Sequence, residues 1–100
     1  MATTSKALYR AAAATSSATL YTVPASTTTV VTNIVVTNTA ASAGTYTLTL
    51  DGVALASGTT IAANDTVVID LKQTLATTKI IAGLASATSI NFHISGVEIS

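Results

Sequence analysis

Apolar and polar side chains alternate with a period of two residues along much of the chain. In the segment 45–50, tyrosine and leucine occupy one face and threonine the other. A similar alternation runs through 67–72 and through 90–95. This period is typical of β-strands that bury one face. Tyr46 is in phase with the leucines of its segment, so we expect its ring in the core.

Turn-forming residues separate these segments. Asp51-Gly52 follows the first one directly, and this dipeptide favours a tight hairpin turn because both residues tolerate positive φ. A return strand is therefore predicted over 53–56. Asn64-Asp65 indicates a turn before the second segment. Gly96 interrupts the third segment, which predicts a β-bulge or kink there, with an apolar face resuming beyond it.

Four further strands are predicted from weaker or longer apolar patterns, over residues 6–12, 18–23, 27–38 and 78–82. The segment 27–38 has apolar side chains on both faces, which predicts a strand that is central in its sheet or covered by a partner. Small residues over 40–44 and 82–87 predict loops.

About eight short strands, with no helix of useful length, predict an all-β fold. The architecture expected is an antiparallel β-sandwich or a jelly-roll-like barrel. A chain of 100 residues has the size of one domain. We expect this domain over residues 6–100, preceded by a flexible amino-terminal arm over residues 1–5.

The chain carries very few charges. Asp, Glu, Lys and Arg make up 8% of the residues, against roughly 25% in ordinary soluble proteins, and the formal net charge is zero. Such a chain tends to self-associate, and protein interfaces are depleted in charge. The alternative is a neutral, hydrated surface of threonine and serine hydroxyls. Nucleic-acid binding is disfavoured, because the four basic residues are dispersed: Lys6, Arg10, Lys72 and Lys79.

Nothing in the sequence predicts membrane insertion or disulfide formation. The most apolar stretch, 30–36, is far shorter than the roughly 20 residues that cross a bilayer. No secretory signal is recognisable, so we expect the protein to stay where it is made or to follow its assembly. The chain has no cysteine and therefore no thiol chemistry.

The sequence offers no convincing catalytic, cofactor or metal site, and we do not expect an enzyme. His93 is the only histidine, and its spacing permits a grouping with Ser95 and Asp70. The G-x-S-x-G pattern of a nucleophile elbow is absent. The acidic residues are scattered, which gives no reason to expect a carboxylate pair or a calcium loop: Asp51, Asp65, Asp70 and Glu98.

Four residues are candidates for contact with a protein partner: Tyr9, Tyr21, Val31 and Val35. Tyrosine is large and amphipathic and is enriched at protein contacts. The two valines lie together on one face of the doubly apolar segment 27–38. The alternative for the two tyrosines is that they cover the edge of the core.

Several short segments follow one another in a particular order. A tyrosine-threonine-valine-proline stretch leads to a long apolar strand that ends in asparagine-threonine, an Asp-Gly hairpin follows, and the chain closes with glycine-valine-glutamate-isoleucine. The segments are 7–10, 20–25, 30–39, 48–53, 61–66 and 83–99. Their order resembles that of small β-sandwich virion proteins of tailed bacteriophages.

This resemblance implies a structural role on the virion. The protein would be a capsid decoration (cement) protein, made in the host cytoplasm and bound to the major capsid protein as a homo-oligomer. A tail or tail-tip component is the alternative in the same class. A carbohydrate-binding module for host adhesion is a third reading, and the lack of tryptophan argues against it.

Overall fold

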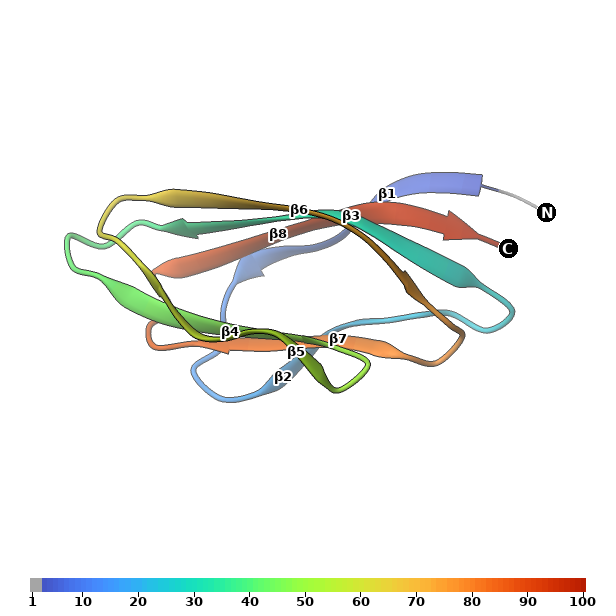
Figure 1. Cartoon of the computed structure of the whole chain (residues 1–100), viewed down its shortest axis with the longest axis horizontal. Helices are drawn as coiled ribbons and strands as arrows, with labels where there is room; N and C mark the ends of the chain where they lie inside the picture. Colours follow the sequence, from blue (N-terminus) through green and yellow to red (C-terminus); the bar gives the residue numbers. More distant parts are fainter. Residues whose placement is uncertain (1–2) are drawn as a thin grey trace.

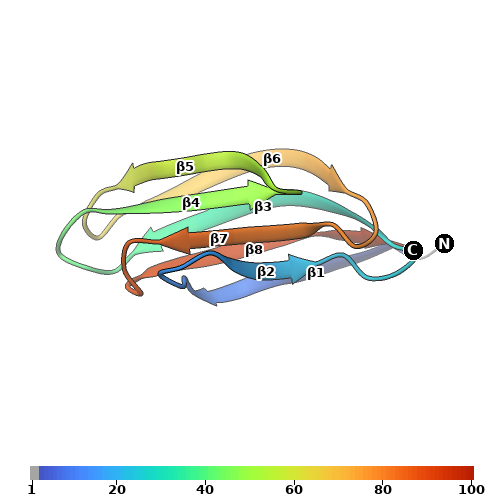
Figure 2. The same cartoon turned by 90° about the horizontal axis from the view of Figure 1, so that it is seen from below.

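The computed structural model describes residues 3–100, which form eight antiparallel β-strands in two sheets and contain no helix (Figures 1 and 2). The domain is elongated, with principal extents of 46 × 21 × 18 Å. The strands are β1 (Thr3–Ala12), β2 (Ala18–Thr22), β3 (Thr28–Asn38), β4 (Gly44–Leu50), β5 (Val53–Ile61), β6 (Thr66–Leu75), β7 (Ile80–Ala85) and β8 (Ile90–Ile99).

The strand order is that of a jelly roll. Sheet A has the order β1-β8-β3-β6 and sheet B the order β2-β7-β4-β5. In Figure 2, each strand of sheet B lies over one strand of sheet A, with β5 over β6 at one long side and β2 over β1 at the other. This order arises when a long antiparallel hairpin is wrapped so that the strands on either side of the β4–β5 hairpin alternate between the sheets. The predicted all-β sandwich is confirmed.

The predictions of individual strands and turns are most accurate where the turn residues favour positive φ. Asp51 and Gly52 have φ values of 54° and 75°, as a two-residue hairpin turn requires. The doubly apolar segment 27–38 becomes β3, which is central in sheet A. The predictions at the edges of strands are less accurate, since β5 continues to Ile61 and β7 occupies Ile80–Ala85, where a loop was expected from residue 82.

The predicted flexible arm over residues 1–5 is wrong for Thr3, Thr4 and Ser5. These residues begin β1 and pair with the end of β8, where Thr3 lies opposite Ile99. The free backbone groups of β8 provide a hydrogen-bonding partner, which orders this segment as a strand. Residues 1 and 2 of the predicted arm lie outside the described residues.

The core forms where alternate side chains of the two sheets meet. Phe92 in β8 lies edge-on to Tyr46 in β4, with ring centroids 6.4 Å apart and an interplanar angle of 72°. Tyr46 is therefore a core residue, as its phase predicts. The largest fully buried apolar side chains are Val23, which follows β2, and residues of both sheets: Val31, Ile34, Val36, Leu48, Ile61, Ile81, Ile90, Phe92 and Ile94.

Strand β8 is regular, which corrects the predicted bulge at Gly96. Its inward positions continue without interruption from Ile90 through Gly96 to Glu98. The apolar residues Val97 and Ile99 consequently stand on the outward-facing positions. The irregularities lie in the two neighbouring strands instead.

Both neighbours of β8 change register beside Gly96. The pairing of β1 shifts between Ala7 and Tyr9, and that of β3 shifts between Val31 and Asn33. A Cβ atom at Gly96 would overlap the carbonyl oxygen of Val30 and lie 2.9 Å from Leu8 Cδ1. A β-bulge increases the local bend of a strand. Glycine at position 96 therefore lets both bulged neighbours close onto β8.

Candidate interaction surfaces

Two of the four predicted contact residues are committed to the interior of the domain. Val31 has no exposed surface, and Tyr21 is 9% exposed. A side chain enclosed by its own core is not available to a partner, so the prediction that these two residues contact another protein is corrected. Val31 and Val35 lie on opposite faces of β3, because the register shift between Val31 and Asn33 changes which positions face inward.

Tyr21 joins the two sheets through a buried hydrogen-bond cluster. Its hydroxyl, on β2 of sheet B, lies 2.9 Å from Thr29 Oγ1 and donates to the carboxylate of Glu98, both on sheet A. Lys6 Nζ lies 3.4 Å from the same carboxylate. Burial, together with the hydrogen bond to Glu98, raises the pKa of Tyr21 to about 12. The cluster is a structural link between the sheets.

The stability of the domain should fall in alkaline solution because of this cluster. The folded-state pKa of Tyr21, about 12, lies above the unfolded value of 10.0, so its contribution is complete below pH 10 and is lost as the pH rises through about 12. The loss amounts to about 2–3 kcal/mol. Urea denaturation of wild type and Tyr21→Phe across this range measures it.

Tyr21→Phe should be about 1–2 kcal/mol less stable than wild type near neutral pH, because the hydroxyl hydrogen bonds are lost. Its stability should then fall less steeply above pH 10. Some alkaline dependence should remain, because burial also raises the pKa of Tyr46. Equal alkaline slopes for wild type and variant would contradict this account of Tyr21.

The other two predicted contact residues keep part of their surface. Tyr9 packs against the core from β1, and its hydroxyl donates to the carbonyl oxygen of Ala12 at 2.9 Å. Val35 is half-buried on the outer face of sheet A, between His93 on β8 and Val68 on β6. A contact of Tyr9 or Val35 with a partner stays a prediction.

The polar residues considered for catalysis share the outer face of sheet A without being joined. Asn33 stands between Ser95 and Asp70 in the register, which separates these two by roughly 10 Å, or two strand spacings. In the part of the chain that the structure describes, the side chain of His93 is hydrogen-bonded to neither of them, and the Ser95 carbonyl oxygen accepts from Thr32 instead. Within residues 3–100, no three side chains of the histidine, aspartate and glutamate type gather closely enough to hold a metal ion.

One long side of the sandwich exposes apolar side chains. The large apolar residues that are most exposed within residues 3–100 all lie on β5 and β6: Val53 at 69%, Leu55 at 36% and Val68 at 58%. Val67, Ile69 and Leu71 on β6 pack against the core but remain partly exposed. We call this side, formed by β5 and β6, the open side (Figure 2).

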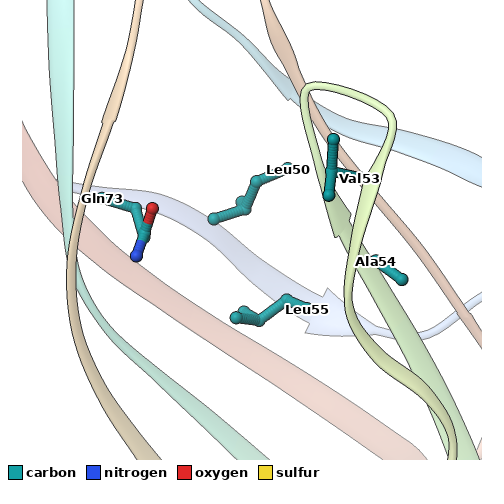
Figure 3. Close-up of a pocket in the computed structure, with 5 residues that line it drawn as sticks. All are labelled: Leu50, Val53, Ala54, Leu55 and Gln73. Atoms are coloured by element: carbon teal, nitrogen blue, oxygen red, sulfur yellow. The ribbon is translucent and has the colours of Figure 1, made fainter.

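A recess lies on the open side, between the two sheets. It has a volume of about 230 Å³ and is lined by Leu50, Val53, Ala54, Leu55 and Gln73. Figure 3 shows Leu50 and Leu55 directed from sheet B toward Gln73 on β6. The volume is below the roughly 300–1,000 Å³ of small-molecule sites. A recess of this size and lining suits apolar side chains of another protein.

The charges of the chain are distributed unevenly between the sheets. Five charged residues lie on strands of sheet A and the other three in turns, whereas the strands of sheet B contain no Asp, Glu, Lys, Arg or His. We call the outer surface of sheet B the uncharged face. Its outward residues are Thr19, Thr22, Thr45, Thr47, Thr49, Ala54, Thr60, Ile80, Ala82 and Leu84.

The four aromatic side chains do not form an exposed platform. Tyr21, Tyr46 and Phe92 are buried, and Tyr9 packs against the edge of the core. Binding of a sugar ring by stacking usually uses exposed aromatic rings, so this surface gives no support to the carbohydrate-binding reading.

Sequence reasoning missed both the open side and the uncharged face. The low charge content was visible, but its concentration on one sheet depends on strand order. The sequence predicts only a return strand for Val53 and Leu55. The signal that could have found the uncharged face is the absence of ionisable residues from four separate segments.

Within residues 3–100, no helix is long and apolar enough to span a lipid bilayer. No protein-family model matches the chain, and no curated protein matches it either.

Proposed function

We propose that this chain is a structural protein of a tailed-bacteriophage virion, and specifically a capsid decoration protein that binds the outer capsid lattice and stabilises it. The resemblance of its segment order to small β-sandwich virion proteins suggests this class. A jelly roll is compatible with it, since viral capsid domains use this fold. Fold alone does not decide function, so the proposal depends on the surface.

The observation that carries the proposal is the open side. Val53 and Leu55 expose apolar surface to water beside the recess on the edge strand β5, and Val68 exposes more on the outer face of the edge strand β6. Burying the exposed part of each of these side chains against a neighbour would contribute about 1–2 kcal/mol. A contact of this strength is modest for one copy. Over the many copies on a shell, such contacts together would strengthen the boundaries between capsid subunits.

The recess gives this contact a definite geometry. Leu50 and Leu55 supply an apolar floor and wall, and the Gln73 amide can donate and accept hydrogen bonds at the rim. An extended segment of a capsid subunit could place one apolar side chain in the recess. Its backbone would then lie within reach of Gln73. We expect the capsid partner to contribute such a segment.

Binding to capsids should depend on Leu55. Leu55→Lys places a charge beside the recess and should weaken binding at least tenfold, since charged side chains are costly to desolvate at an interface. The measurement is co-sedimentation of purified protein with capsids that lack it, followed by their resistance to heat or osmotic shock. Ala12→Lys, on the exposed end of β1, is the matched control and should bind as wild type.

Unchanged shell resistance after saturating addition of wild-type protein would refute the cementing role. Equal binding by Leu55→Lys and wild type would remove the open side from the contact. Labelling the protein on intact particles separates a head location from a tail location. Label confined to tails would replace the decoration role with that of a tail component.

A further inference from the structure

The uncharged face has a chemistry that favours an uncharged partner. Any ionised side chain of a partner that was buried against its strands would lose hydration and find no opposite charge, since the ion pair of Asp51 and Lys79 lies in the turns at one end of the sheet. Threonine hydroxyls can donate and accept hydrogen bonds, so those of the face can pair with other hydroxyls, although Thr49 Oγ1 donates to the Ala82 carbonyl oxygen and Thr47 Oγ1 accepts from the Gly58 amide within the sheet. Ile80 and Leu84, on the central strand β7, are half-buried and add apolar surface.

The outer face of sheet A has a different chemistry. Arg10, Asp70 and His93 stand on its outward positions, and Lys72 projects from the same edge strand as Asp70. A copy that offered this face to sheet B would have to desolvate those charges without compensation. The surface of this molecule that best complements the uncharged face is therefore the uncharged face of a second copy.

The area of the face limits the surface that such an association can bury. Four strands of five to nine residues cover about 400 Å² in projection, taking about 4.8 Å between strands and about 3.3 Å per residue. Two copies would thus bury roughly 800 Å² in total, if each face is treated as flat. This area is below the roughly 1,200–2,000 Å² that stable complexes bury. The association should be weak, with a Kd on the order of 10–100 µM.

We infer that two copies of this chain pair through their uncharged faces to form a symmetric dimer, with sheet B against sheet B. The inference is independent of the virion role, because it concerns the protein alone in solution. In such a dimer the open sides lie at the margins of the interface, and of the residues that line the recess only Ala54 belongs to the uncharged face. Each dimer would therefore carry two recesses, and simultaneous use of both would raise its apparent affinity for a repetitive surface.

Sedimentation equilibrium of the purified full chain, from about 10 µM to about 1 mM, tests the pairing. Wild type should shift from monomer to dimer over this range. Leu84→Lys places like charges in both copies of the face and should raise the Kd at least tenfold. Val35→Lys is the matched control, because Val35 is also half-buried, apolar and outward on a central strand, but of sheet A. It should dimerise as wild type does.

Thr19→Lys repeats the test on an exposed edge position of the same face, so a folding defect of Leu84→Lys does not leave the result open. Wild-type protein that stays monomeric up to 1 mM would overturn the inference. Loss of the dimer in Val35→Lys, with its retention in Leu84→Lys, would place the contact on sheet A and overturn it as well. Binding of Leu84→Lys to capsids is scored separately, so failure of the dimer and failure of the decoration role remain distinguishable.

Discussion

Val31→Asp should lower the free energy of unfolding by at least about 6 kcal/mol. Val31 is fully enclosed in the core, and no basic residue is present among the buried side chains around it. An unpaired carboxylate buried there costs at least about 4–5 kcal/mol, to which the lost apolar burial is added. Domains of this kind are stable by only about 5–15 kcal/mol, so a cost of this size removes a large part of the stability and, toward the lower end of the range, all of it.

The measurement is far-UV circular dichroism with urea denaturation. Val35→Asp is the control, because Val35 lies four residues along the same strand but on the outward face. Its cost should be about 1–2 kcal/mol, from the loss of a half-buried apolar side chain and the poor strand propensity of aspartate. A cooperative Val31→Asp protein with a midpoint near that of wild type would show that β3 does not present this residue to the core.

The pair Val31 and Val35 also shows where sequence reasoning reached its limit. Simple alternation places both residues on one face of the segment 27–38, and both were predicted to contact a partner. The extra residue that β3 inserts between Val31 and Ile34 changes the phase, so that Val31 faces inward and Val35 outward. Thr32-Asn33 interrupts the apolar run at the shift, but because apolar residues occupy both faces of this segment, the two polar residues do not by themselves show that one residue is extra.

Local features were predictable wherever the residues act on their own backbone. The Asp51-Gly52 hairpin follows from the tolerance of both residues for positive φ. Tyr46 was placed in the core from its phase with two leucines. The all-β class follows from many short alternating segments. None of these inferences requires knowledge of which strands are neighbours.

Features that depend on strand order could not be predicted. The inward position of Glu98 is an example, since its hydrogen bond to Tyr21 joins residues 77 positions apart in different sheets. The uncharged face likewise appears only when β2, β4, β5 and β7 are placed side by side. Pairings between distant segments are set by the packing of the whole chain, which a local pattern does not encode.

Gly96→Ala should lower the free energy of unfolding by about 2–4 kcal/mol, which corresponds to a decrease in Tm of roughly 10–20 °C for a domain of this size. At an unobstructed strand position, the same substitution would be expected to stabilise the protein by about 0.5–1 kcal/mol. Here the new Cβ would overlap the carbonyl oxygen of Val30, so steric repulsion should outweigh the entropic gain.

The control is Gly58→Ala. Gly58 has a φ of 57°, and a Cβ placed there would meet no atom within 4 Å. Its cost should therefore come only from the left-handed backbone, at about 1–2 kcal/mol. Calorimetry of wild type and both variants gives the comparison. A Gly96→Ala protein at least as stable as wild type would mean that β1 and β3 do not close onto β8 as tightly as described.

A double-mutant cycle should identify which neighbour causes the repulsion. Leu8→Ala removes the side chain that would lie 2.9 Å from the new Cβ, whereas the Val30 carbonyl belongs to the backbone and stays in place. We therefore expect Leu8→Ala to offset the cost of Gly96→Ala only in part, with a coupling energy of about 0.5–1 kcal/mol. Full compensation would assign the requirement for glycine to Leu8 packing. Partial compensation would assign most of it to the close approach of the bulged β3 backbone, whose position determines that Val31 faces the core.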